Sequence, residues 1–302
     1  MKSKIILIAG GTGLVGSHLK KWLISSGFEV RILSRRSSDA SKNIYNWDPI
    51  NGIIDNQALD NVSTLINLSG AGIADQLWTP WRKRELLNSR IFSTKFLVKL
   101  LNESDHKVTT FISSSAIGIY GNTELEIVHE DHKAANTFLA KTCLRWEEEA
   151  NKLKNTSVKK VIFRIGNVLA KDGGIVPTII SSFKFRLAPI FGSGQQYFSW
   201  IHIDDLCNLI TCSITNDRFS GTYNAVAPGF LSYTNLVTLI KQIRKGYYIT
   251  FKIPTTALRI ILGGMSQLLT DGSRVSSEKA QDSGFKFKYP TAGKALTQII
   301  GE

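Results

Sequence analysis

The sequence is 302 residues long, with 43% hydrophobic and 20% charged residues, which indicates a globular protein with one large domain and room for a smaller one. Its formal charge of +13 suggests polyanion binding, but the basic residues are dispersed and their densest cluster, residues 82–85, includes an acid, so we expect a solvated face and no specific nucleic-acid binding. No apolar run approaches the ~20 residues of a membrane span and we identify no signal peptide, so we expect a cytoplasmic protein without membrane contact.

Strand-like and helix-like patterns alternate along the first half of the chain. Residues 4–11 and 29–36 are short apolar runs, and the helical pattern between them is closed by Gly27. Further strand-like runs lie at 62–70, 109–116 and 159–169, with segments of helical length between them, of which 83–104 is the clearest. This alternation predicts an α/β fold, a Rossmann-type doubly wound parallel sheet covered by helices on both faces.

The pattern becomes irregular beyond about Leu169, where Gly and Pro punctuate the stretches "KDGGIVP", "RLAPIFGSGQQ" and "AVAPGF". We therefore expect a Rossmann domain over residues 1–168, to which residues 203–227 return. A smaller, mostly C-terminal substrate domain would comprise residues 169–202 and 228–302.

A glycine-rich stretch, "AGGTGLVG", follows the first predicted strand and opens the first predicted helix. Gly10, Gly13 and Gly16 stand three residues apart. This spacing, in this context, allows a tight turn, close approach of a pyrophosphate to the backbone, and close packing of the helix on the sheet. The phosphates would face the helix N-terminus, where free N–H groups favour negative charge. We predict dinucleotide contacts from Gly10, Thr12, Gly13, Leu14, Val15 and Gly16.

The end of the second predicted strand indicates which dinucleotide is bound. NAD sites place a carboxylate about twenty residues beyond the glycines, but here Ser34, Arg35 and Arg36 occupy that place. A guanidinium offers bidentate hydrogen bonds to a 2'-phosphate, and a hydroxyl adds another. The sequence therefore predicts NADP(H); the alternative is that the arginines form an exposed turn.

Several motifs resemble those of the extended short-chain dehydrogenase/reductases, and more closely the branch known as epimerase family proteins. The resemblance covers essentially the whole chain and rests on the glycine loop, "WDP" (47–49), "INLSGAGI" (66–73), "NSR" (88–90), "FLAKTCLRWE" (138–147), "FSWIHIDDL" (198–206) and "SRVSSEKAQDSGFKFKYP" (273–290). It implies a Rossmann domain with NADP across the strand ends and a small C-terminal domain over the cofactor.

Carried over position by position, the resemblance implies that Leu68, Ser69 and Gly70 line the cofactor. It makes Arg90 a candidate phosphate or ribose contact, although a lone arginine on a helix is as often solvated. Ser115 stands where related enzymes place a hydroxyl that orients the substrate carbonyl, at a strand end where ligands bind in such sheets.

The helix predicted over residues 137–150 lacks the Tyr-x-x-x-Lys pair of the wider superfamily. Phe138 occupies the tyrosine position, Thr142 the lysine position, and Lys141 is one residue early, about 100° around the helix. Members of the closer branch also lack the pair and keep "WE", so the resemblance implies that Glu147 faces the cofactor cleft. The apolar spacing of the helix is also compatible with scaffold alone.

Few other proton donors or ligands are available. Tyr120 is a catalytic candidate if its ring turns into the cleft, whereas burial with a bonded hydroxyl is the alternative. "HEDH" (129–132) lacks a third metal ligand and "HIDD" (202–205) suits a hinge, so we expect no metal. The three cysteines have no metal-ligand spacing and suit a reducing compartment.

Two functions remain open from the sequence. The favoured one is an NADP-dependent oxidoreductase or epimerase-like enzyme for a polar or anionic small molecule, with Ser115, a water or Tyr120 handling the proton. The alternative is a non-catalytic NADP(H)-binding regulatory protein read by a protein partner, since the resemblance links some relatives to cell division. A homodimer is equally open.

Overall fold

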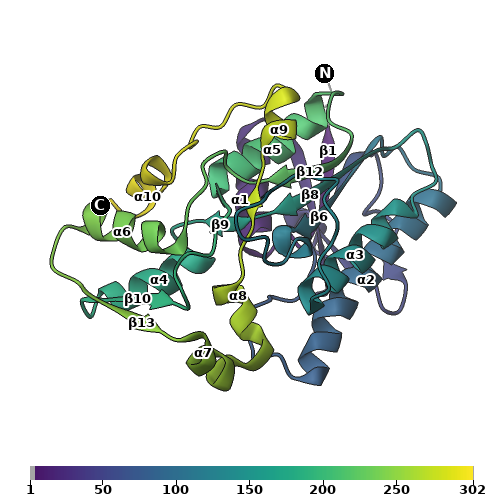
Figure 1. Ribbon diagram of the computed structural model, residues 1–302. Helices are drawn as coiled ribbons and strands as arrows, with labels where there is room; N and C mark the ends of the chain where they lie inside the picture. Colours follow the sequence, from purple (N-terminus) through teal and green to yellow (C-terminus); the bar gives the residue numbers. More distant parts are fainter. Residues whose placement is uncertain (1–3, 302) are drawn as a thin grey trace.

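An eight-stranded sheet forms the centre of the protein, whose computed structural model describes residues 4–301 (Figure 1). The strand order is β12-β8-β6-β5-β1-β2-β3-β4, and every neighbouring pair is parallel except β3 and β4. The predicted doubly wound Rossmann-type fold is confirmed. The strands are β1 (Ile5–Ala9), β2 (Glu29–Ser34), β3 (Ile44–Asp48), β4 (Ile53–Ile54), β5 (Val62–Asn67), β6 (Thr110–Ala116), β8 (Lys159–Ile165) and β12 (Gly221–Ala225).

Helices cover both faces because successive strand residues point to opposite sides. Ile6 and Ile8 pack with α1 (Leu14–Ser25) and α5 (Ile203–Thr215), while Leu7 and Ala9 pack on the opposite face with α2 (Pro80–Glu103) and α3 (Phe138–Asn151). The order of the strands reverses at β1, which lies between β2 and β5. Ligands of open α/β sheets bind at the carboxyl end of such a switch point.

A smaller lobe lies beside the carboxyl edge of the sheet and has its own apolar cluster, which includes Phe183, Trp200 and Leu296 (Figure 1). Its two-stranded parallel sheet is packed by three helices. These elements are α4 (Ile175–Phe183), β10 (Leu187–Phe191), α6 (Tyr233–Arg244), β13 (Ile249–Ile253) and α10 (Ala292–Ile300).

Two further strand pairs join distant segments: β9 (Asn167–Leu169) with β11 (Trp200–His202), and β7 (Ile127–Val128) with β14 (Arg274–Val275). The remaining helices are η1 (Ala40–Lys42), η2 (Ile117–Ile119), α7 (Thr255–Leu262), η3 (Gly263–Ser266), α8 (Gln267–Thr270) and α9 (Glu278–Asp282). Of these, η1 lies beside β3, η2 beside α3 and α9 beside β12, while α7, η3 and α8 follow one another near the start of α2 (Figure 1). Among residues 4–301, no helix combines the length and apolar character needed to cross a membrane.

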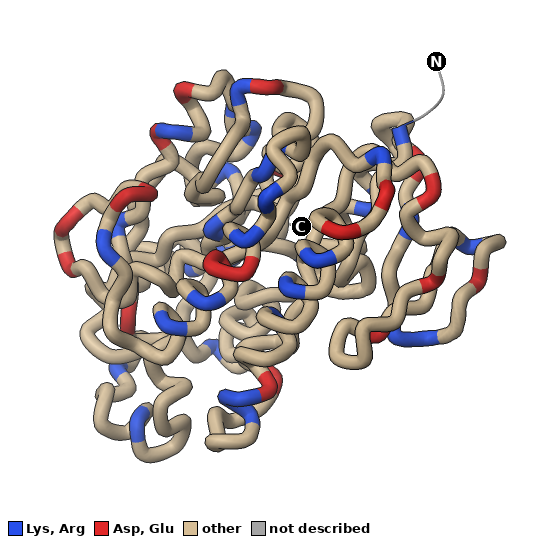
Figure 2. The backbone as a smooth tube through the Cα atoms, turned by 90° about the vertical axis from the view of Figure 1, so that its right-hand side faces the viewer, with Lys and Arg blue, Asp and Glu red and all other residues tan. Residues whose placement is uncertain are grey.

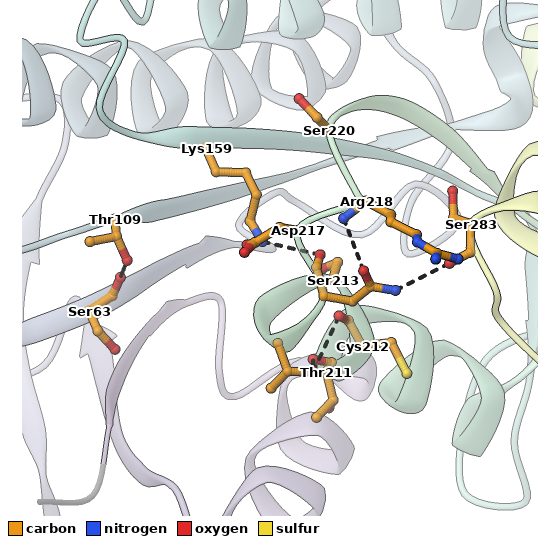
Figure 3. A network of polar contacts seen from close by, with 12 residues as sticks. Ser63, Thr109, Lys159, Thr211, Cys212, Ser213, Asp217, Arg218, Ser220 and Ser283 are labelled. Carbon is orange, nitrogen blue, oxygen red and sulfur yellow. Dashed lines mark hydrogen bonds and ion pairs between the residues drawn. The ribbon is translucent and has the colours of Figure 1, made fainter.

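Polar contacts fasten the amino ends of the strands, opposite the predicted site (Figure 3). The Thr109 hydroxyl donates to the Ser63 carbonyl at 3.2 Å, and Lys159 donates to Asp217 at 3.2 Å, so the loop after α5 is tied to the start of β8. Basic and acidic residues are interspersed over the side seen in Figure 2. The positive charge is therefore spread over this side.

Candidate functional site

The loop after β1 is packed directly against the loop after β5. Gly10 has φ +83°, and a Cβ there would lie 2.6 Å from both the carbonyl carbon and oxygen of Leu68. A Cβ on Gly16 would lie 2.2 Å from the Gly10 carbonyl oxygen. Only glycine therefore allows the turn and the close approach of α1 to β1.

The N-terminus of α1 is left open toward the carboxyl edge of the sheet. Gly13 is the N-cap and supplies no side-chain hydrogen bond, and the first turn contains no acidic residue. Thr12 and Gly13 are exposed, whereas Leu14 and Val15 pack against the main core. The free N–H groups and the helix dipole therefore form an anion-binding end.

The side chains at the end of β2 are exposed and basic. The Ser34 hydroxyl accepts the Arg36 N–H at 3.2 Å, which fixes the turn, and both Arg35 and Arg36 lie on the surface. Asp48, on the neighbouring strand, has its pKa lowered by hydrogen bonds from Asn51 and to a smaller extent by the charge of Arg35. The end of β2 itself carries two guanidinium groups and no carboxylate. It therefore suits the 2'-phosphate of NADP(H) better than the free 2'-hydroxyl of NAD(H).

Asn67 organises the loop after β5 from inside the protein. It is fully buried, donates to the Thr94 hydroxyl at 2.8 Å, and accepts both the backbone N–H and the hydroxyl of Ser69. Leu68 packs on the main core and Gly70 is exposed. The predicted residues Leu68, Ser69 and Gly70 therefore lie next to Gly10 at the switch point.

Arg90 lies directly beneath this loop. A Cβ on Gly70 would be 3.2 Å from its Cζ, and its guanidinium donates to the carbonyls of Ala71 (3.1 Å) and Leu86 (2.8 Å) over the Trp146 ring. Burial lowers the pKa of Arg90, and no carboxylate among residues 4–301 pairs with it. The structure thus places a half-buried cation without a carboxylate partner among residues 4–301 beside the loop; a contact with a cofactor phosphate stays a prediction.

Ser115 and Glu147 meet in a buried polar network, and a catalytic role for Ser115 stays a prediction. The Ser115 hydroxyl donates to Glu147 Oε1 at 2.6 Å, and Arg164 binds the same carboxylate through Nε (2.9 Å) and Nη2 (2.8 Å). Ser115 and Glu147 are only 2% and 8% exposed. Glu147 is therefore the partner of Arg164 in this structure, and the expectation that it faces the cofactor cleft stays a prediction.

Tyr120 belongs to the same network. Its hydroxyl donates to Asn224 Oδ1 at 2.6 Å and accepts from Arg164 at 2.9 Å, and its ring is 2% exposed. Burial raises the pKa of Tyr120 to about 12. A catalytic role for Tyr120 requires a ring turned into the cleft. In the structure the ring is buried, and its hydroxyl forms hydrogen bonds with Asn224 and Arg164.

At the start of α3, Phe138, which the resemblance places at the tyrosine position, lies against aromatic and basic side chains. Phe138 packs edge-on against Trp78 with ring centroids 5.3 Å apart, and Lys83 Nζ lies 5.3 Å from the Phe138 centroid. The Thr142 hydroxyl donates back to the Phe138 carbonyl at 2.8 Å. This end of α3 supplies no phenol, and the ammonium of its first turn, that of Lys141, is exposed.

The other sequence candidates lie apart from the switch point or inside the core. His129 and His132 pair with different glutamates, and no metal-ligand group occurs within the described range 4–301. His202 caps α5 and hydrogen-bonds Gln298 at 2.9 Å, a structural role at the lobe boundary. Trp200, in the "FSWIHIDDL" motif, is fully buried.

Arg164 and Asn67 are buried residues beside the site that the sequence analysis does not single out. Arg164 stands in "VIFRIG", a run otherwise expected to be buried on both faces, so a charge there signals a buried counter-ion. Asn67 lies in the "INLSGAGI" motif, but the resemblance assigns roles only to the three residues that follow it.

Comparison with known proteins identifies the family. The model of the NAD dependent epimerase/dehydratase family matches residues 6–226. The chain belongs to this family. A second model, a domain of unknown function designated DUF1731, matches residues 253–299 of this family member.

Relatives of the family extend over the full length of the chain. It is 32% identical to an epimerase family protein SDR39U1 homolog, chloroplastic, of Arabidopsis thaliana, covering 98% of this chain and 86% of that protein. It is 32% identical to the epimerase family protein YfhF of Bacillus subtilis, with 98% of each covered. The crystal structure of human epimerase family protein SDR39U1 with NADPH is similar at a TM-score of 0.90, with 25% identity and 98% of each chain covered.

Proposed function

We propose that the protein binds NADP(H) at the carboxyl edge of the sheet, with the pyrophosphate at the N-terminus of α1 and the 2'-phosphate beside Arg35 and Arg36. The observation that carries this proposal is the uncapped first turn of α1 behind a glycine loop that a Cβ would obstruct. The human relative, crystallised with NADPH, supports the same choice.

Equilibrium titration with NADPH and NADH tests the cofactor assignment. We expect Arg35→Ala to weaken NADPH binding by roughly tenfold or more and to leave NADH binding unchanged, because only NADPH carries the 2'-phosphate. Lys95→Ala, which removes an exposed charge from α2, is the matched control. Unchanged NADPH affinity in Arg35→Ala would overturn the assignment.

We propose further that this site serves hydride transfer to a polar or anionic small molecule, as an oxidoreductase or epimerase-like enzyme. A bound nicotinamide supplies hydride chemistry. The chain itself contributes position: the Ser115 hydroxyl, at the end of β6, donates to Glu147, whose carboxylate Arg164 holds in place. Without the tyrosine, general-acid assistance worth ~10²–10⁴ in rate is missing, which restricts turnover to activated substrates.

A second candidate function is cofactor binding without turnover, coupled to a protein partner. It is favoured by the apolar Phe138 at the tyrosine position and by the burial of the Tyr120 hydroxyl. Single-turnover mixing of NADPH-loaded protein with aldehydes, ketones, quinones and nucleotide-sugars separates the two. Loss of the near-ultraviolet nicotinamide absorbance, slowed in Ser115→Ala, supports the enzyme; tight NADPH binding with no loss supports the second candidate.

A further inference from the structure

A cavity of about 340 Å³ opens on the small lobe, between α6 and β13. Thr234, Val237, Thr238 and Lys241 line one wall, and their spacing places them on one face of α6. The opposite wall and the rim come from β13 and the segment around β10, through Thr250, Phe251, Lys252, Ile190, Ser193 and Gln195. Its volume falls in the range of small-molecule sites.

The charged residues in the segments that build the small lobe have one sign. Residues 173–200 and 228–270, which build α4, β10, α6, β13 and α7, contain no Asp or Glu. The same two segments contain seven basic residues: Lys184, Arg186, Lys241, Arg244, Lys245, Lys252 and Arg259. Since no carboxylate in these segments offsets them, the positive potential at the cavity favours an anion.

The polar groups of the lining leave donors free for a ligand. Lys241 Nζ donates to the Thr250 hydroxyl at 3.0 Å, so it is positioned at the wall. Neither Lys252 Nζ nor the Gln195 side-chain amide is paired with any residue in the described range 4–301. Phe251 is 40% exposed beside them and forms an apolar surface over the buried Ile190 and Val237.

We propose that this cavity is a second ligand site, distinct from the cofactor site, for a small organic anion. Its carboxylate or phosphate would pair with Lys252 and Lys241, and its apolar body would lie on Phe251. Two ammonium groups and an amide with no competing acid suit such an anion, and an inorganic ion would leave the apolar surface unused. The proposal is independent of the reaction at the switch point.

Isothermal titration of the full-length protein, kept saturated with NADPH, tests this site with phenyl phosphate, benzoate, inorganic phosphate and neutral phenol. We expect saturable binding of phenyl phosphate or benzoate. Whichever of the two binds more tightly shows whether the site prefers a phosphate or a carboxylate. Phenol and inorganic phosphate should bind at least roughly tenfold more weakly. Saturation with NADPH keeps the probes out of the cofactor site.

Two variants locate the binding. Lys252→Gln should weaken the organic anion by roughly tenfold or more, and Lys252→Arg should retain most of the affinity. Lys184→Gln removes one exposed charge from the same acid-free region, outside the lining, and should change the affinity by less than about twofold. The proposal is overturned by no binding, by inorganic phosphate binding as tightly as phenyl phosphate, or by equal weakening in Lys252→Gln and Lys184→Gln.

Discussion

Arg164 carries a buried charge on β8, and the carboxylate of Glu147 compensates it. Its side chain is 9% exposed and Glu147 binds it through two nitrogens. Although burial opposes the charge, these hydrogen bonds raise the pKa of Arg164 above its ordinary value. The pair also fixes Ser115 and Tyr120, so it determines the shape of the strand ends beside the proposed cofactor.

Glu147→Gln should therefore lower the free energy of unfolding by about 3–5 kcal/mol, because it leaves the Arg164 charge buried without a counter-ion. Urea denaturation measures the loss. Glu148→Gln, on the exposed side of the same helix, should stay within about 0.5 kcal/mol of the wild type. A Glu147→Gln variant as stable as Glu148→Gln would show that the pair contributes nothing to folding.

Cys143 leads to a prediction about alkaline pH. Burial, and next the charge of Glu147, raise the pKa of its thiol from 9.0 to about 11. The folded state therefore keeps the proton more tightly than the unfolded chain, so this stabilisation is complete below pH 9 and is lost as pH rises through about 11. The loss is on the order of 2 kcal/mol.

Urea denaturation of wild type and Cys143→Ala, each at pH 8, 9, 10 and 11, checks this prediction, with every variant referred to its own value at pH 8. We expect a shallower decline in Cys143→Ala. Some decline should remain, because burial also raises the pKa of Cys207 to about 12. Identical pH profiles in the two proteins would contradict the assignment of this loss to Cys143.

Helix α1 is positioned by two glycines with different local surroundings. A Cβ on Gly16 would meet the backbone of Gly10 and Gly11 at 2.2 and 2.7 Å, whereas a Cβ on Gly13 would meet only the Gly10 carbonyl, at 3.5 Å. Gly16 is therefore required for packing. Gly13 lies at the open helix end, where only a ligand would contact the added methyl.

Gly16→Ala should lower the free energy of unfolding by about 1–3 kcal/mol, because neither backbone segment can yield cheaply. Gly13→Ala should leave the unfolding free energy nearly unchanged and still weaken NADPH binding. Parallel urea denaturation and NADPH titration of both variants separate the effects. Gly13→Ala with full NADPH affinity would argue against a pyrophosphate at this helix end.

Sequence patterns predicted the elements whose periodicity is local. The strands β1, β2, β5, β6 and β8 and the helices α1, α2 and α3 lie where the apolar spacing indicated. For the small lobe the sequence predicts only an irregular region, because β10 and β13 are short and four of the five β13 residues are exposed, which removes the apolar alternation. The site shows the same difference between local and long-range features. The Gly10 loop is set by neighbouring residues and could be predicted, whereas the burial of Tyr120 depends on Arg164 and Asn224, which lie far along the chain.

At the scale of the whole molecule, the two lobes are interleaved. After β9 the chain enters the small lobe, returns through α5 and β12 to the large sheet, and leaves again through α6. Near the end, Phe285 packs in the core of the large lobe, and Leu296 in that of the small one. Because the chain passes back and forth between the lobes, we expect the two lobes to fold together. A ligand bound to either lobe should therefore affect the stability of both.

The net charge allows a prediction of how the stability of the folded chain depends on salt concentration. With 37 basic and 24 acidic residues, the folded chain repels itself, and this repulsion weakens when salt shortens the Debye length from roughly 30 Å at 0.01 M to about 8 Å at 0.15 M. We expect the urea midpoint to rise over this range of sodium chloride concentration and to change little beyond it. A midpoint that falls would mean that attractive ion pairs outweigh the repulsion. Lys184→Glu, which removes positive charge from the acid-free region, should reduce the rise.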